Sequence, residues 1–171
     1  SSLADLLDHD STVGSRVVPK VPPGADHVPL EIRVGLVSQS PITAFRPGPN
    51  VLCRYQHGDV IPAQELMKRI ASSPQHEIHC SGGPVQINQK HYQGDVSLLK
   101  GQGDWLPVVS LDLETYVASV VGAEMPSSWH GEALKAQAVA ARSYAMAHLA
   151  LPATMAYHLG DTTLWQVFAG E

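Results

Sequence analysis

The chain has 171 residues, of which 44% are hydrophobic and 16% charged, and its formal net charge is −5. This composition is typical of one folded domain and argues against disorder and against a nucleic-acid partner. No apolar run reaches the roughly 18 residues of a transmembrane segment. Because the chain begins with Ser1, we expect a processed form or a fragment whose signal peptide or anchor would lie upstream.

The first part of the chain divides by composition. Residues 1–29 contain four prolines and no clear periodicity, which predicts a linker or arm. Residues 30–110 are predicted to be rich in short strands separated by glycine turns. Within them, 30–37 is typical of a strand, 51–63 of a hairpin around a Gly-Asp turn, and 62–73 of a brief helix.

From Leu111 the apolar residues recur at intervals of three and four, which indicates a helix. Asp112 is the expected N-cap, and Glu114 would stand in the first turn, where a negative charge is favoured. Pro126 discourages continuation. A second, alanine-rich helix is expected to begin near 129–132 and to run to about Leu149. The predicted fold class is therefore α+β, a β-rich part followed by a helical hairpin.

Two cysteines, Cys53 and Cys80, are separated by 27 residues in the sequence. They could form a disulfide in an exported protein or remain buried thiols in a reducing compartment, and their spacing does not decide between these states. Histidines lie near them in the chain, but the spacing matches no standard zinc motif. Polar loop histidines are the plainer interpretation. These histidines are His57, His76, His79 and His91.

Glu124 falls on the apolar face of the first predicted helix, near its C-terminal end. Desolvation and the negative end of the helix dipole would both raise the pKa of this carboxyl group. A carboxylic acid that stays protonated near neutral pH is suited to general acid catalysis. The alternative is structural, because Glu124 could also cap a loop amide or pair with Arg142.

The stretch 111–148 resembles the core motif of the SpoIID/LytB family, including its E-M-P triplet. Residues 156–171 are similar to a second segment of that family, with Asp-Thr-Thr followed by Gln-Val, and the whole resemblance covers roughly 30–171. The motif residues in register are Tyr116, Val120, Glu124, Met125, Pro126, Trp129, Glu132, Ala133, Leu134, Lys135, Ala136, Gln137, Ala138, Ala140, Ala141, Arg142, Ser143 and Tyr144.

The resemblance implies a peptidoglycan lytic transglycosylase with Glu124 as its catalytic acid. Such an enzyme cleaves the β-1,4 bond between N-acetylmuramic acid and N-acetylglucosamine and leaves a 1,6-anhydro end. One carboxyl group suffices, whereas ordinary glycosidases use two. The alternative within the family is a non-catalytic glycan-binding or amidase-enhancing module. Glycan strands, and for the alternative a cell-wall amidase, are the implied partners, and the implied location is exported, in the cell envelope.

Four further motif residues are expected to bind substrate, each beside a structural alternative. Arg142 would hold glycan or orient Glu124, or else join a solvated basic face with Lys135. Gln137 would bind an acetamido or a backbone group. Trp129 would stack on a sugar or cover the corner between the helices. Tyr144 shares a helical stripe with Gln137. Glu132, at the start of the second helix, is interpreted as helix-stabilising.

The chain also departs from the family pattern. Some members bind zinc near the Asp-Thr-Thr segment, whereas here Gly160 and Trp165 stand where cysteines might be expected and only His158 remains. We therefore expect no metal and no cofactor. A metal-dependent hydrolase built on His76–His91 is a third hypothesis, which rests on sequence proximity alone. The segment 111–171 is expected to be the helical catalytic part, and the chain ends at Glu171, before the usual end of the family domain.

Overall fold

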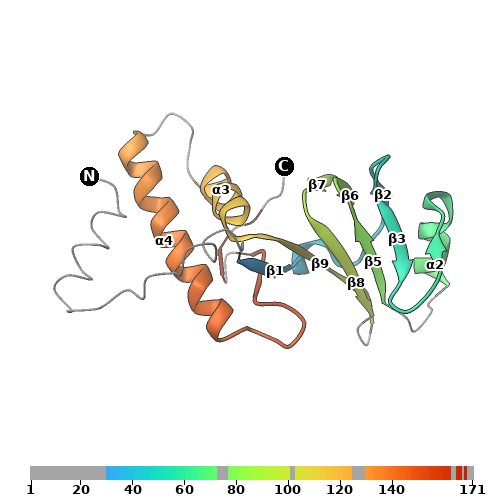
Figure 1. The fold of residues 1–171 in the computed structure, drawn as a ribbon. Helices are drawn as coiled ribbons and strands as arrows, with labels where there is room; N and C mark the ends of the chain where they lie inside the picture. Colours follow the sequence, from blue (N-terminus) through green and yellow to red (C-terminus); the bar gives the residue numbers. More distant parts are fainter. Residues whose placement is uncertain are drawn as a thin grey trace, which may run out of the picture.

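The protein is an α+β structure in which a β-rich part is followed by two helices, as the sequence predicts (Figure 1). The computed structural model describes residues 30–72, 77–100, 103–124, 130–162, 165, 166 and 168, except for the side chain of Glu124. The predicted arm 1–29 lies outside these residues.

The larger sheet has seven strands in the order β10-β1-β9-β8-β5-β3-β4. All of its pairs are antiparallel except β1 with β10. In chain order its strands are β1 (Glu31–Gly35), β3 (Leu52–Tyr55), β4 (Val60–Ile61), β5 (Ile78–Ser81), β8 (Asp95–Lys100), β9 (Trp105–Asp112) and β10 (Leu159–Gly160).

A second sheet has three antiparallel strands in the order β2-β6-β7. Its inward residues, Phe45, Val85, Ile87 and Tyr92, belong to the same hydrophobic core as the buried residues of the larger sheet. The small sheet therefore packs against one face of the large one. Its strands are β2 (Phe45–Pro47), β6 (Val85–Ile87) and β7 (Lys90–Tyr92).

The predicted hairpin and brief helix are confirmed. β3 and β4 pair across the Gly-Asp turn, with Arg54 opposite Val60. The 3-10 turn η3 (Ala63–Glu65) leads into α2 (Leu66–Ala71), and another 3-10 turn, η2 (Val37–Gln39), follows β1. The Trp105 indole N–H donates to the Ile70 carbonyl at 2.9 Å, which ties α2 to the start of β9.

Alternation along the strands gives the larger sheet one covered face and one open face. On β8, Val96 and Leu98 are buried in the core, whereas Ser97 and Leu99 are only partly buried. β5 follows the same rule, with Cys80 in the core and His79 on the open side. Because successive side chains point to opposite faces, the partly buried residues form a second surface of the sheet.

The question left open for the two cysteines is decided by strand register. Cys53 on β3 is directly opposite Cys80 on β5, and their sulfur atoms form a disulfide inside the hydrophobic core. The bond takes Cys80 away from any metal site built on the nearby histidines. It closes a loop of 27 residues.

The two predicted helices are confirmed. β9 passes directly into α3 (Leu113–Glu124), and α4 (Gly131–Ala150) packs against α3. α3 ends two residues before Pro126, as the helix-breaking position of that proline predicts. Figure 1 shows both helices beside the sheet, next to β1 and to the end of β9 that continues into α3.

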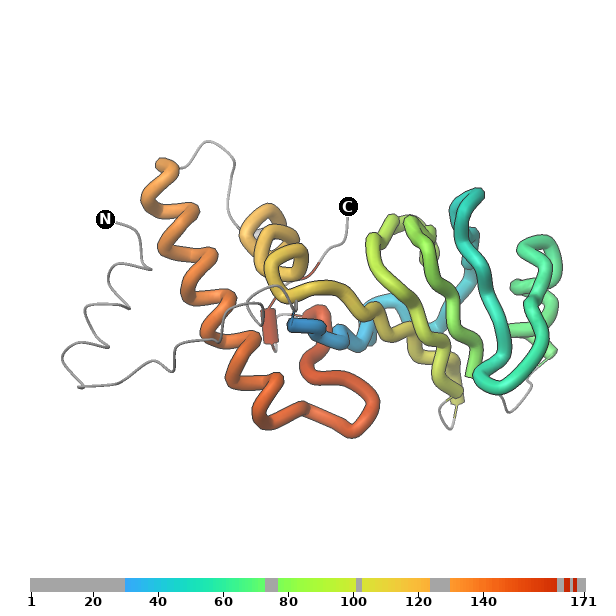
Figure 2. The backbone as a smooth tube through the Cα atoms, in the orientation of Figure 1, coloured from blue at the N-terminus to red at the C-terminus, as the bar shows by residue number. Residues whose placement is uncertain are grey.

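The chain after α4 returns to the sheet, which the sequence did not predict. β10 pairs in parallel with β1, with Val34 opposite Leu159. Two further bonds fix the return, because the Arg33 N–H donates to His158 Nδ1 and the His158 N–H donates to the Arg33 carbonyl, each at 2.9 Å. Figure 2 shows this segment turning back from the end of α4 to β1. The return holds the second helix to the sheet.

Candidate functional site

The candidate site lies where α3 ends and α4 begins. Glu124, the predicted catalytic acid, is the last residue of α3. The structure does not describe the Glu124 side chain or the residues Met125, Pro126 and Trp129. The predicted role of Trp129 therefore stays a prediction. What the structure does place is the scaffold that holds the end of α3.

The start of α3 is capped as predicted. The Thr115 N–H donates to Asp112 Oδ1 at 2.9 Å, and the Thr115 hydroxyl donates to Asp112 Oδ2 at 2.7 Å. These bonds, the backbone bond above all, stabilise the carboxylate and lower the pKa of Asp112. Along the helix, Tyr116, Val117 and Val120 are buried in the core. The cap and this buried face fix the direction in which α3 delivers Glu124.

An ion pair joins the two helices. Arg142 on α4 donates from Nε and Nη2 to the two carboxylate oxygens of Glu114 on α3, at 2.7 Å each. The hydrogen bonds lower the pKa of Glu114 and raise that of Arg142. The guanidinium therefore bridges to the first turn of α3, at the opposite end of the helix from Glu124. The predicted substrate role of Arg142 stays a prediction.

A buried amide connects both helices to the C-terminal segment. Gln166 donates to the Tyr116 hydroxyl on α3 at 3.1 Å and to the Ala141 carbonyl on α4 at 3.4 Å. The ring of Phe168 stacks on Tyr116 with centroids 5.6 Å apart. These contacts place the Gln166 amide between α3 and α4. The role of Gln166 could not be predicted from local sequence, because its partners lie 50 and 25 residues away.

The three predicted substrate residues on α4 do not share one side of the helix. The buried residues Ala141 and Ala145 define the face that packs inward. At 100° per residue, Tyr144 lies about 160° around the helix from Arg142, and Gln137 lies about 140° from it. Tyr144 packs against His148, with ring centroids 4.5 Å apart, and both Tyr144 and Gln137 are partly buried. Around the helix, Arg142 therefore lies between Ala145 and the buried Val139, whereas Tyr144 and Gln137 lie beyond Ala141 on the other side.

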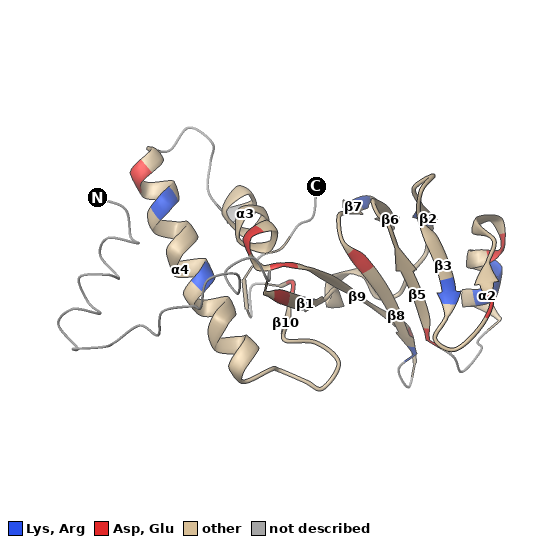
Figure 3. Ribbon diagram, in the orientation of Figure 1, with Lys and Arg blue, Asp and Glu red and all other residues tan. Residues whose placement is uncertain are grey.

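Charge on α4 is confined to its first half and middle (Figure 3). Glu132 stands in the first turn, where the sequence analysis interpreted it as helix-stabilising, and Lys135 lies 3.6 Å from it. Both side chains are more than half exposed. The predicted solvated position of Lys135 agrees with this arrangement.

The segment in which the resemblance led us to consider zinc ligands, around His158, is tied into the fold by its own contacts. His158 Nδ1 accepts the Arg33 N–H, and burial first, with the Arg33 charge second, lowers the pKa of its imidazole. Gly160 lies against the Trp165 ring so closely that a Cβ there would overlap it. Among the described residues, no three His, Cys, Asp or Glu side chains gather as metal ligands would.

The same segment carries a buried carboxylate, Asp161, that was not singled out from the sequence. Asp161 is 4% exposed and accepts hydrogen bonds from the Ser38 N–H and the Ser38 hydroxyl. Burial, and then the charge of Asp161, raises the pKa of the Tyr92 phenol. Tyr92 in turn stacks on Phe168, with centroids 5.9 Å apart. Asp161 thus anchors the returning segment to the turn after β1.

Comparisons with known proteins find similarity to one family and to two curated proteins. Residues 101–171 match the model of the SpoIID family, described as stage II sporulation protein. An uncharacterized protein of Brachyspira hyodysenteriae is 38% identical over 86 residues, and stage II sporulation protein D of Bacillus subtilis is 40% identical over 68 residues. The matches cover 50% and 37% of this chain.

The chain covers only 23% of the Brachyspira protein and 20% of the Bacillus protein. No solved structure is a significant match. Within the part of the chain that the structure describes, no helix has the length and apolar character needed to cross a membrane.

Proposed function

From the premise that this chain is a member of the SpoIID family through residues 101–171, we propose that it is a peptidoglycan lytic transglycosylase. The family is broadly linked to cell-wall lytic activity. The observation that carries the proposal is that the family match includes the E-M-P triplet, whose glutamate closes α3. The proposed substrate is the β-1,4 bond between N-acetylmuramic acid and N-acetylglucosamine in glycan strands of the cell envelope.

In the proposed mechanism Glu124 works alone as acid and base. Its protonated carboxyl group donates to the glycosidic oxygen as the bond to C1 breaks, and N-acetylglucosamine leaves. The 6-hydroxyl of the muramic acid attacks C1, and its proton passes to Glu124. The products are a 1,6-anhydro end and a free 4-hydroxyl, and no water is consumed. A positioned acid/base of this kind accelerates such steps by roughly 10²–10⁴-fold.

The scaffold of α3 and α4 supports this assignment in physical terms. A general acid must be held within hydrogen-bond reach of its oxygen. The Arg142–Glu114 pair and the Gln166–Tyr116 hydrogen bond tie the first turn of α3 to its neighbours, and the buried Val117 and Val120 hold the rest of the helix against the core. A helix held along its length in this way gives its last residue a defined direction.

The decisive experiment is mass spectrometry of the products from purified peptidoglycan incubated with the longest form of the protein that carries this chain. Release of 1,6-anhydro-muramyl ends is expected. Reducing muramic acid ends would show hydrolysis and overturn the proposal. Glycan binding or amidase stimulation with no cleaved product would assign the non-catalytic alternative.

A further inference from the structure

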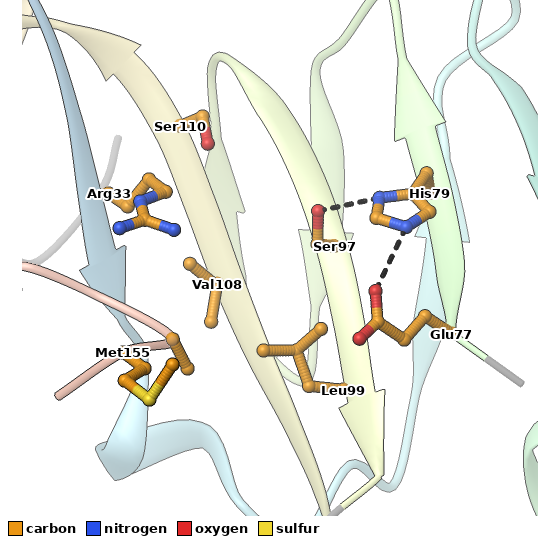
Figure 4. Close-up of a pocket in the computed structure, with 9 residues that line it drawn as sticks. Arg33, Glu77, His79, Ser97, Leu99, Val108, Ser110 and Met155 are labelled. Carbon is orange, nitrogen blue, oxygen red and sulfur yellow. Dashed lines mark hydrogen bonds and ion pairs between the residues drawn. The ribbon is translucent and has the colours of Figure 1, made fainter. Parts of the chain in front are cut away.

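A cavity of about 320 Å³ lies on the open face of the larger sheet. Four strands line it, with Arg33 on β1, Val108 and Ser110 on β9, Ser97 and Leu99 on β8, and His79 on β5. Glu77, just before β5, and Met155 and Ala156, after α4, complete the lining. Figure 4 shows Arg33 and Met155 on one side and His79 and Glu77 on the other, with Val108, Leu99 and Ser97 between them. The volume is at the lower end for small-ligand sites.

Strand register brings these residues together from distant parts of the sequence. Gly35, Val108, Ser97 and His79 are successive partners across β1, β9, β8 and β5 and form one row of the open face. Arg33 is directly opposite Ser110 in a neighbouring row. The ring of Tyr157 closes the first row by packing on Gly35. The cavity is therefore a product of the sheet and of the segment that returns after α4.

One end of the cavity offers hydrogen-bond donors. Within the described part of the chain, the Arg33 guanidinium has no ion-pair or hydrogen-bond partner, and neither has the Ser110 hydroxyl. Both residues are only partly exposed. A planar guanidinium beside a free hydroxyl is suited to a carboxylate, which it can bind through two parallel hydrogen bonds.

The opposite end offers acceptors. His79 Nδ1 lies 2.9 Å from Ser97 Oγ, and His79 Nε2 lies 3.2 Å from Glu77 Oε2. The second contact is close enough for an ion pair but is not aligned as a hydrogen bond. Whichever nitrogen carries the proton, Ser97 Oγ keeps a lone pair, and Glu77 keeps acceptor capacity on both oxygens. A carboxylate beside a hydroxyl lone pair is suited to an ammonium group.

The distance between the two ends sets the size of the ligand. β1 and β5 are three strand spacings apart, or about 14 Å between backbones. The side chains of Arg33 and Glu77 span part of this distance. Two extended residues span about 7 Å. The apolar floor formed by Leu99 and Val108 would contact small side chains between the two charged ends.

We propose that this cavity binds a short zwitterionic peptide of about two residues. The terminal carboxylate of the ligand contacts Arg33 and Ser110, and its terminal ammonium contacts Glu77 and Ser97. Met155 and Ala156 cover the ligand from the segment after α4. The site does not depend on glycan cleavage, because none of its residues belongs to the junction of α3 and α4.

The test is a titration of the full isotope-labelled chain with the dipeptide alanyl-alanine, followed by amide chemical shifts in NMR. Saturable shifts are expected at the cavity residues. Two blocked probes separate the charges, since alanyl-alanine amide lacks the carboxylate and N-acetyl-alanyl-alanine lacks the ammonium. Each should bind at least about tenfold more weakly, because charge-assisted hydrogen bonds are lost.

Matched variants locate the site. Arg33→Gln and Glu77→Gln should each weaken binding about tenfold or more. Arg46→Gln and Asp59→Asn should leave it unchanged, since these exposed charges lie on β2 and in the turn before β4, away from the cavity. Ala156→Trp fills the cavity without removing a charge and should abolish binding, which covers the case in which Arg33→Gln fails to fold in circular dichroism.

Absence of saturable shifts at cavity residues would overturn the proposal. Equal affinity for the free and N-acetylated dipeptide would overturn it too, as would equal affinity of the Arg33→Gln and Arg46→Gln proteins. None of these results bears on the products formed from peptidoglycan, so the two proposals fail separately.

Discussion

Arg142 and Glu114 connect α4 to the first turn of α3 through two parallel hydrogen bonds of 2.7 Å. The pair lies 28 residues apart in the sequence, and its arginine belongs to the same motif as Glu124. The glutamate also stands where the helix dipole favours a negative charge. One motif residue thus acts on the helix that carries the proposed catalytic acid.

The first prediction measures this link by a double-mutant cycle. Glu114→Gln and Arg142→Gln are combined, and unfolding in urea is followed at pH 7. Because 66% of the Glu114 side chain is exposed, water screens the charges, and we expect a coupling of about 0.2–1 kcal/mol. The pair Glu132 and Lys135 is the control and should give a smaller value, because its cation is 64% exposed against 33% for Arg142 and its charged atoms lie 3.6 Å apart.

The coupling should also depend on pH in a defined direction. The hydrogen bonds from Arg142 hold the folded pKa of Glu114 below the ordinary value of 4.5. The contribution is therefore complete above that value and is lost as the pH falls through the folded pKa. A coupling that is the same at pH 7 and at pH 2 would contradict the ion-pair account.

The second prediction concerns Glu124 itself. Glu124→Gln keeps the shape of the side chain but cannot donate an acidic proton, so turnover of glycan should fall by roughly 10²–10⁴-fold. Glycan binding and the free energy of unfolding should change little. Glu132→Gln is the matched control and should keep near-normal turnover. Similar turnover in the Glu124→Gln protein and the wild type would remove this residue from the mechanism.

The third prediction concerns the return of the chain to β1. His158 accepts a backbone N–H in its neutral form, and burial holds its pKa below the ordinary value of 6.5. Below that pH the unfolded chain binds a proton more readily than the folded one. Stability is therefore full above pH 6.5 and declines as the pH falls from there through the folded pKa.

The matched variant is His158→Asn, whose amide oxygen can accept the same bond but does not titrate. The difference in unfolding free energy between wild type and variant should become more unfavourable to the wild type as the pH falls from 7.5 towards 5. A difference that stays constant over this range would show that His158 is not the titrating group.

The fourth prediction concerns the disulfide. Its loop of 27 residues corresponds to about 3.5 kcal/mol of lost chain entropy in the unfolded state. Replacing both Cys53 and Cys80 by Ala should therefore lower the free energy of unfolding by about 2–4 kcal/mol. The wild type under a reducing agent serves as a comparison, and a loss below about 1 kcal/mol in both would contradict this account.

The sequence by itself determined the elements whose signals are local. The apolar period of α3, its Asp112 cap and the stop before Pro126 act within a few residues, and the observed helix runs from Leu113 to Glu124 accordingly. The strand β1 and the hairpin of β3 and β4 could be predicted for the same reason. The motif that contains Glu124 is also contiguous, which is why the family match could be anticipated.

Only the tertiary structure decided the contacts between distant residues. The parallel pairing of β10 with β1, the partner of Cys53 and the approach of Arg142 to Glu114 join positions 27 to 125 residues apart. Arg33, Ser110, Ser97 and His79 share one surface because four strands align in register. Local propensity carries no information on such register, since it is set by which hydrophobic faces can be buried together.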